Sequence, residues 1–226
     1  MTDWQDIQHW AGVTADGIPG PATARAIKAK AGIGDTIVVE APVEAHTDLT
    51  ARAVLEIAEH EGVVLEAYKD SVGVWTWGVG VTSNSGHSVS RYRDNPSTMT
   101  NAMAVYIWLL REKYLPAVLW AFKDRPLAEH ELAAALSFHW NTGAIGRADW
   151  VKKVLAGDTE GARASFMNWR SPAEIIPRRR AERDLFFDGK WTSDGIVPVY
   201  GVAKPSYSPR GATLVDIRPA LAEALR

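Results

Sequence analysis

The stretch EGVVLEAYKDSVGVWTWGVG, Glu61 to Gly80, places two carboxyl groups and a hydroxyl group on one short segment. Asp70 follows Glu61 by nine residues, and Thr76 follows Asp70 by six. Glycines stand at positions 62, 73, 78 and 80, where they favour tight turns and leave room beside the backbone. Two acids and a hydroxyl on a segment of this kind are typical of a site that hydrolyses sugars.

The helix predicted for residues 51–61 brings Glu61 to the edge of an apolar face. The apolar residues of this face recur at helical spacing, with Glu61 as the next member of the series: Val54, Ile57 and Ala58. Burial at such an edge favours the protonated carboxyl group that a general acid requires. Taken alone, a glutamate at the end of a helix more often has no catalytic role, so the assignment depends on Asp70 and Thr76.

A β-hairpin is predicted next, with its loop at Val72–Val74. This pairing puts Asp70 opposite Thr76 on one side of the hairpin, where the hydroxyl can help the carboxylate hold a water molecule. Trp75 and Trp77 alternate with Thr76 along the strand, so they point to the other side. We therefore assign both tryptophans to packing beneath the hairpin rather than to stacking on a sugar.

The composition is that of an ordinary soluble globular protein and excludes several functional classes. The chain has 226 residues, 46% of them hydrophobic and 23% charged, and a formal net charge of −2. This charge gives no general attraction to nucleic acid or to anionic membranes. No apolar run approaches the roughly 20 residues that span a bilayer, and the polar N-terminus lacks the features of a signal peptide. Without cysteine there are no disulfides or thiolate metal sites, and we expect neither a metal nor a cofactor.

The sequence divides into four segments. Residues 1–35 are predicted to form a small helical unit, and residues 36–47 a linker, because a mixed, Pro-containing stretch follows the last helix-forming run. Residues 48–190 are predicted to form the main domain. Residues 191–226 are a C-terminal extension with a candidate strand at 196–200 and a short helix after it, and the sequence assigns no role to this segment.

The run E-G-x-x-L-x-A-Y-x-D-x-x-G-V-W-T-x-G-x-G resembles the signature of the phage-type lysozymes of glycoside hydrolase family 24. In that family a glutamate, an aspartate nine positions on and a threonine six after it form the catalytic triad, so the resemblance implies catalytic Glu61, Asp70 and Thr76. It also implies an α+β fold that is mostly α, with a small β-hairpin or sheet lobe and a helical lobe. Many members have a histidine directly after the G-x-G. Val81 stands there in this chain, and His87 is a candidate substitute.

Two further stretches resemble parts of the same family. The stretch SFHWNTG at 137–143 resembles one that lies across the cleft from the catalytic hairpin, which makes Asn141 a candidate for hydrogen bonding a sugar amide. The alternative for Asn141, a place in a helix-end cap, is equally open. The basic run 178–180 fits an arginine-rich helix near the end of the family's domain, where one arginine is expected to approach Glu61 or the saccharide. We assign Arg180 to substrate binding, and the alternative for the run is a solvated basic face.

The N-terminal phrase GVTADGIPGPATARAI, residues 12–27, resembles the repeat core of peptidoglycan-binding domains. The resemblance covers roughly half a usual module, so the first helix of that family is missing or shortened. It implies that residues 1–35 bind the bacterial cell wall. The other interpretation is a helical hairpin that packs on the main domain.

The main resemblance implies an endolysin, a bacteriophage muramidase that hydrolyses the β-1,4 bond between N-acetylmuramic acid and N-acetylglucosamine in bacterial peptidoglycan. Peptidoglycan is then the expected partner, with no nucleic acid and no membrane span, and the chain is expected to be a monomer. Such an enzyme is made in the host cytoplasm and reaches the cell wall after holin-type release. Two alternatives stay open: a non-hydrolytic wall-binding or phage structural protein with a lysozyme-like fold, and a lytic transglycosylase.

Overall fold

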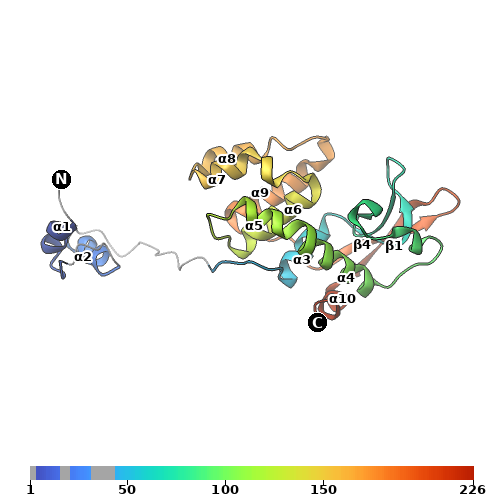
Figure 1. Ribbon diagram of the computed structural model, residues 1–226, viewed down its shortest axis with the longest axis horizontal. Coiled ribbons are helices and arrows are strands. Elements are labelled where there is room, and N and C mark those ends of the chain that lie inside the picture. Colours follow the sequence, from blue (N-terminus) through green and yellow to red (C-terminus); the bar gives the residue numbers. More distant parts are fainter. Residues whose placement is uncertain (1–3, 16–20, 32–43) are drawn as a thin grey trace. The chain divides into compact units, whose positions relative to one another are not determined.

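The computed structural model describes residues 4–15, 21–31 and 44–226, and the chain divides into two compact units, Met1–Pro42 and Val43–Arg226 (Figure 1). The predicted linker lies mostly outside the described residues. None of the helices in the described ranges is long and apolar enough to cross a membrane.

The described part of the N-terminal unit consists of two helices, α1 (Trp4–Ala11) and α2 (Pro21–Ala31). The Gln8 side chain of α1 is buried, and its amide donates to the hydroxyl of Thr23 on α2 at 3.1 Å. Near the other end of α2 the Lys30 ammonium lies over the Trp10 ring, 5.7 Å from its centroid. These contacts join the two helices.

About half of the residues described in the second unit lie in helices. The first helix of this unit, α3 (Ala51–Glu59), begins after Thr50. The Thr50 hydroxyl accepts a hydrogen bond from the Ala53 amide at 3.1 Å and so satisfies one of the free amides of the first turn. A π-helical turn, Leu110–Tyr114, follows helix α4 (Met99–Leu109). The regular α-helical hydrogen bonds are interrupted here because Pro116, in the first turn of the next helix, has no N–H to donate. The helices are α3 (Ala51–Glu59), α4 (Met99–Leu109), α5 (Leu115–Ala121), α6 (Glu129–Thr142), α7 (Asp149–Leu155), α8 (Thr159–Phe166), α9 (Ile176–Asp188) and α10 (Arg218–Ala224).

Helix α6 forms the centre of the helical part. It is buried without interruption from Glu131 to Phe138, and α9 packs along it. Phe138 belongs to a cluster of aromatic rings and stands edge-on to Trp150, with 5.3 Å between the ring centroids. Trp150 also contacts Phe166 and Phe186, at 4.6 and 5.0 Å. This apolar packing fixes α6 and α9, from which the polar side chains of the site project.

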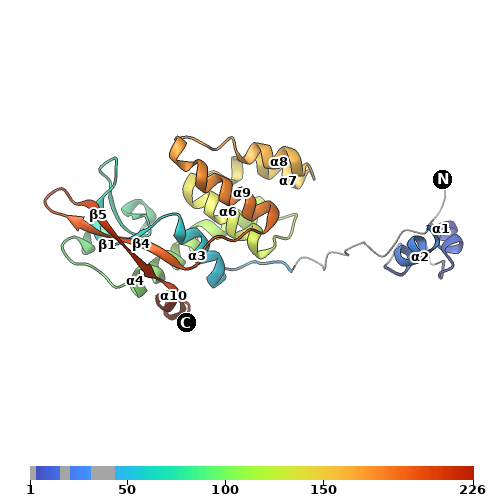
Figure 2. The ribbon, with the colours of Figure 1, turned by 180° about the vertical axis from the view of Figure 1, so that it is seen from behind.

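The sheet has five strands in the order β3-β2-β1-β4-β5, and two of them come from the C-terminal extension. The strands are β1 (Val63–Lys69), β2 (Trp75–Gly78), β3 (Val81–Thr82), β4 (Ile196–Ala203) and β5 (Ser208–Asp216). β1 pairs with β4 in parallel, while the other neighbours are antiparallel. Seen from behind, β4 and β5 run beside β1, and α10 follows them (Figure 2). The extension is therefore part of the lysozyme-like sheet lobe.

The register of the first hairpin differs from the prediction. Thr76 pairs with Tyr68, not with Asp70, and Trp75 pairs with Lys69. The loop is longer than predicted because the Asp70 carboxylate accepts hydrogen bonds from the main chain within it. A shift of two residues keeps every side chain on its predicted face, so Asp70 and Thr76 remain on the same side of the hairpin. The architecture as a whole is the predicted α+β fold that is mostly α.

Candidate active site

Glu61 lies at the joint between α3 and β1, and its side chain is 19% exposed. α3 ends at Glu59, earlier than the predicted helix, and Gly62 with φ +67° turns the backbone into β1. On the other side a Cβ at Gly80 would stand 3.5 Å from Glu61 Oε2. Any larger residue at this position would contact the carboxyl group, so glycine keeps space beside it. Glu61 thus stands between the sheet and the helices.

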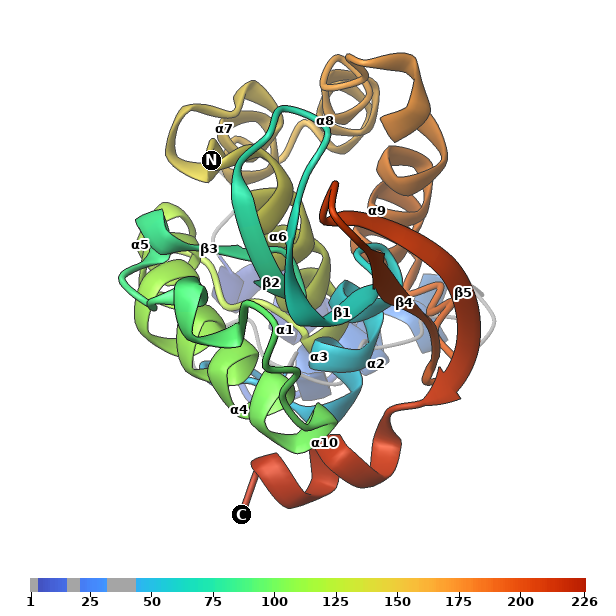
Figure 3. The ribbon, with the colours of Figure 1, turned by 90° about the vertical axis from the view of Figure 1, so that its right-hand side faces the viewer.

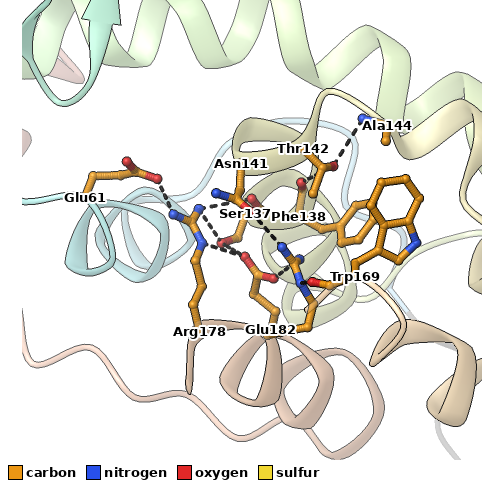
Figure 4. A network of polar contacts seen from close by, with 10 residues as sticks. Glu61, Ser137, Phe138, Asn141, Thr142, Ala144, Trp169, Arg178 and Glu182 are labelled. Carbon is orange, nitrogen blue, oxygen red and sulfur yellow. Dashed lines mark hydrogen bonds and ion pairs between the residues drawn. The ribbon is translucent and has the colours of Figure 1, made fainter. Parts of the chain in front are cut away.

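The Glu61 carboxylate forms an ion pair with Arg178 of α9, which is buried (Figure 4). The guanidinium is held in place by groups other than Glu61. Its Nε donates to Glu182 Oε1 at 2.8 Å, and its Nη2 donates to the carbonyl and the hydroxyl of Ser137 at 3.1 and 3.2 Å. Burial works to lower the pKa of Arg178, but the charges of Glu61 and Glu182 outweigh it and raise this pKa above its usual range. A fixed positive charge therefore faces the carboxyl group.

The same network continues to the surface through Arg179. Glu182 shares its second oxygen with the buried Arg179 guanidinium, whose Nη2 donates to Asn141 Oδ1 at 2.7 Å. Arg179 Nε also donates to the Trp169 carbonyl at 2.9 Å. Two glutamates and two arginines alternate along this path, so the cluster is neutral and each buried charge has a partner.

Asn141 is exposed at the end of α6 and contributes to a pocket of about 360 Å³. Because Arg179 donates to its side-chain oxygen, the amide NH₂ of Asn141 is left to donate to a ligand. The pocket is lined by Asn141, Thr142, Asn168, Trp169, Ser171, Pro172, Ile175 and Arg179. The sequence had singled out only Asn141 from this set. Residues 168–175 lie between helices, in a region without a periodic pattern that would have drawn attention to them.

Asp70 directly follows β1, and its carboxylate organises the turn. Oδ1 accepts hydrogen bonds from the amides of Val72 and Val74, at 3.0 and 2.8 Å. Within the described residues Oδ2 has no hydrogen-bond partner, so this oxygen can accept one from water or substrate. Two amide donors on one oxygen fix the orientation of the carboxylate.

Thr76 lies on β2 and is 3% exposed. Its hydroxyl donates to the Val74 carbonyl at 3.1 Å. With its proton engaged in this way, the oxygen retains lone pairs that can accept a hydrogen bond from water. Asp70 and Thr76 therefore both present acceptors, and both are anchored to Val74.

Tyr68 is a site residue that the sequence reasoning missed. Burial raises its pKa to about 12, and the negative charges of Asp70 and then Glu61 act in the same direction. The phenol is thus near both carboxylates and stays protonated at any physiological pH. Tyr68 faces the side of Asp70 because the two are separated by one strand period, and this spacing was the signal that could have identified it.

The remaining predicted residues take different positions. Arg180 is exposed on α9 and makes no side-chain hydrogen bond with the residues that the structure describes, so Arg178 is the arginine that reaches Glu61. Trp77 is fully buried and stacks on Tyr92 at 3.8 Å, as predicted for a packing residue. His87 bonds the Tyr92 hydroxyl through Nε2 at 3.0 Å and lies 5.6 Å from the Trp77 ring, so it braces β2 from beneath. Val81 is buried in the core.

The fold and the two carboxyl groups on either end of β1 define a lysozyme-like glycosidase. The profile of the phage lysozyme family matches residues 58–183, more than half of the chain, and the chain belongs to this family. Glu61, Asp70 and Thr76 all fall within the match. Membership confirms the predicted enzyme class, a glycoside hydrolase of the lysozyme type with a muramidase, bacteriolytic function.

Relatives of known name support the same class. An endolysin of Acyrthosiphon pisum secondary endosymbiont phage 1 is 31% identical over 151 residues, which cover 61% of this chain and 97% of that protein. An endolysin of Salmonella phage P22 is 28% identical over 147 residues, with the same shares. Among solved structures, an endolysin from Escherichia coli O157:H7 phage FAHEc1 is 27% identical with a TM-score of 0.58, covering 66% of this chain and 99% of that one.

Proposed function

We propose that Glu61 is the general acid of a peptidoglycan muramidase, and that Asp70 and Thr76 hold the attacking water. The bond cut is the β-1,4 bond between N-acetylmuramic acid and N-acetylglucosamine. The observation that carries this proposal is the placement of the three groups around one strand: Glu61 precedes β1, Asp70 follows it, and Thr76 lies on the paired β2. The relatives named endolysins support the cell wall as substrate.

In the first half of the reaction, Glu61 donates its proton to the glycosidic oxygen as the bond to the anomeric carbon breaks. The carboxyl group becomes negative in this step, and Arg178 stabilises the new charge from a fixed position. Glu182 helps to hold the guanidinium in this position, because its carboxylate accepts a hydrogen bond from Arg178 Nε at 2.8 Å.

In the second half, a water molecule between Asp70 and Thr76 attacks the anomeric carbon and gives a proton to Asp70. Asp70 Oδ2 and the lone pairs of Thr76 Oγ1 are the acceptors that orient this water. Because two groups serve the water, we expect inversion, which yields the α-anomer from a β-glycoside. Proton NMR of the first products distinguishes it from the β-anomer that retention would give.

The direct test is a turbidity assay on purified peptidoglycan with wild type and Glu61→Gln. The variant keeps the shape of the side chain but has no proton to donate, so we expect lysis to fall by at least about 10²-fold. Glu160→Gln, an exposed glutamate on α8, is the matched control and should lyse like wild type. Full lysis by Glu61→Gln would falsify the assignment.

Mass spectrometry of the products separates the alternatives. Hydrolysis adds one water and leaves a reducing end on each new muramic acid, whereas a transglycosylase leaves anhydro ends. Binding to peptidoglycan without new ends would indicate a non-hydrolytic wall-binding or structural protein. The presence of Asp70 and Thr76 beside Glu61 favours hydrolysis, because only hydrolysis requires a held water.

We also propose that the N-terminal helical unit binds peptidoglycan. Trp4 and Trp10 on α1 are 43% and 52% exposed, and exposed indole rings offer flat apolar surfaces for sugar rings. The test is co-sedimentation with peptidoglycan in the inactive Glu61→Gln background, with and without Trp4→Ala and Trp10→Ala. We expect the two substitutions together to reduce the bound fraction. Unchanged binding would exclude these side chains.

The enzyme is further proposed to act as a monomer, made in the host cytoplasm and reaching the wall after holin-type release, with no nucleic acid as partner. One chain supplies Glu61, Asp70 and Thr76, so a second copy is not needed to complete the site. Light scattering should give the mass of one chain, and a dimer would contradict this. Cells that express the protein should lyse only after their membrane is permeabilised.

A further inference from the structure

The C-terminal extension lies along the strand that joins the two carboxyl residues of the site. Glu61 precedes β1 and Asp70 directly follows its last residue, Lys69, so β1 is the spacer between the acid and the water-binding group. β4 pairs with β1 in parallel, and β5 covers the outer edge of β4 (Figure 3). The match to the phage lysozyme family ends at residue 183, so these strands lie beyond the matched residues.

At the first end of β1 the extension packs on the residue next to Glu61. Gly62 has φ +67°, and a Cβ there would stand 2.9 Å from the Tyr200 ring and 3.3 Å from the Pro198 carbonyl. This is closer than side chains approach one another, so Gly62 and β4 are in direct contact. The extension is also bound to α3, because the buried Glu56 carboxylate accepts hydrogen bonds from the Thr192 amide and hydroxyl, at 3.0 and 2.8 Å.

At the second end of β1 the turn between β4 and β5 contacts both strands that flank the Asp70 loop. The Lys69 amide donates to the Tyr207 carbonyl at 2.8 Å. The Tyr207 ring stands edge-on to Trp75, with 5.0 Å between the centroids. Lys69 and Trp75 are the paired residues that close the hairpin loop, so one residue of the extension contacts both sides of that loop.

The Tyr207 contact is kept in spite of backbone strain. Tyr207 and Asp94 have φ of +58° and +55°, and they are the only residues other than glycine with positive φ in the described ranges. Such a conformation is unfavourable for a residue with a side chain and persists only where the surroundings impose it. Here the two strained residues are joined by a hydrogen bond, in which the Tyr207 hydroxyl donates to Asp94 Oδ2 at 2.8 Å. Lys204 adds ion pairs to Asp94 and Glu66.

We propose that the C-terminal extension is a splint that fixes the distance and orientation between Glu61 and Asp70, with Tyr207 as its positioning residue. The inference rests on the catalytic roles proposed above. The splint contacts the chain at each end of β1, whereas the partners of the two carboxyl groups come from outside the extension: Arg178 for Glu61, and the Val72 and Val74 amides for Asp70. Because a misplacement of about 1 Å can cost on the order of 10²-fold in rate, loosening one end should reduce turnover more than substrate binding.

The test is steady-state kinetics on soluble peptidoglycan fragments with Tyr207→Ala and Tyr207→Phe, each well below its melting temperature. We expect Tyr207→Ala to lower kcat by about tenfold or more with little change in KM, because the ring on Trp75 is lost. Tyr207→Phe keeps the ring and loses the hydroxyl that bonds Asp94 and Arg93, so its kcat should lie between that of Tyr207→Ala and wild type. Leu214→Ala, an exposed position on β5, is the control and should match wild type.

The outcomes separate this proposal from the proposed function. A folded Tyr207→Ala with wild-type kcat, or a loss of kcat that vanishes on cooling, overturns the splint and leaves only a contribution to stability. If Tyr207→Ala does not fold, Lys204→Met loosens the same turn at its ion pairs, and a wild-type kcat there overturns the splint as well. Glu61→Gln is measured in the same assay. If that variant is active, the catalytic assignment itself fails.

Discussion

The two ends of β1 hold their carboxyl groups in different ways. Glu61 is fixed by Arg178, which lies 117 residues further along the chain and belongs to a buried, neutral network. Asp70 is fixed by amides two and four residues away in its own turn. The Glu61 end therefore depends on the packing of α6 and α9, while the Asp70 end depends on local backbone geometry. Substitutions around Glu61 should affect folding and catalysis together, and those around Asp70 mainly catalysis.

Glu182→Gln should have the largest effect on stability. The substitution leaves Arg178 and Arg179 buried with only Glu61 to balance them, and breaking a buried ion pair costs about 3–5 kcal/mol. Urea unfolding measures this loss, and Glu160→Gln on the exposed face of α8 should stay within about 0.5 kcal/mol of wild type. A variant as stable as wild type would show that the network is not needed for the fold.

The next largest effect on stability is expected from His60, and it depends on pH. Burial, followed by the charges of Arg178 and Arg179, lowers its pKa from 6.5 to about 4. Between these two values the unfolded chain takes up a proton that the folded chain does not, so stability should fall as the pH drops from about 6.5 to 4, by up to about 3 kcal/mol. In His60→Gln this part of the pH dependence should disappear. The measurement is the difference in unfolding free energy between variant and wild type at pH 7.5 and pH 4.5, and an equal difference at both values would contradict the prediction.

Asp70→Asn should separate stability from activity at the other end of β1. The asparagine oxygen can still accept from the Val72 and Val74 amides, so the loss of the charge should cost about 1 kcal/mol of stability. Activity should fall by roughly 10²–10⁴-fold, because the amide cannot accept a proton from water. Urea unfolding and muropeptide release from peptidoglycan measure the two effects. A large loss of stability with activity retained would reverse the comparison between the two ends.

The same contrast explains what the sequence could predict. Glu61, Asp70 and Thr76 were predicted together because their spacing is local. The register of the hairpin was wrong because the Asp70 side chain bonds to its own loop, which lengthens the turn beyond the simplest one. An aspartate before a Ser-Val-Gly stretch is a signal for such a turn, so this error was avoidable.

Contacts between distant segments were beyond sequence reasoning. The strand at 196–200 was predicted, but a strand pattern does not name its partner, and its pairing with β1 joins residues such as Val63 and Val199. β5 was missed, because it is almost wholly exposed and begins Ser-Pro-Arg-Gly, which is typical of a turn. On α9 the basic run was recognised, but the choice among its arginines depended on how the helix is rotated against α6.

Substitution of Arg180 should have the smallest effect on stability, and it tests which arginine of α9 binds the saccharide. It lies two residues from Arg178 on α9 but is exposed, so Arg180→Gln should change the free energy of unfolding by less than about 0.5 kcal/mol. If it contacts the saccharide as predicted, KM for peptidoglycan should rise several-fold with kcat unchanged, because an exposed side chain contributes equally to binding the substrate and the transition state. Lys113→Gln, also exposed, removes the same charge elsewhere. An equal rise in KM in both variants would mean general attraction to the wall, and no rise in Arg180→Gln would leave Arg178 and Arg179 as the arginines of α9 that serve the site.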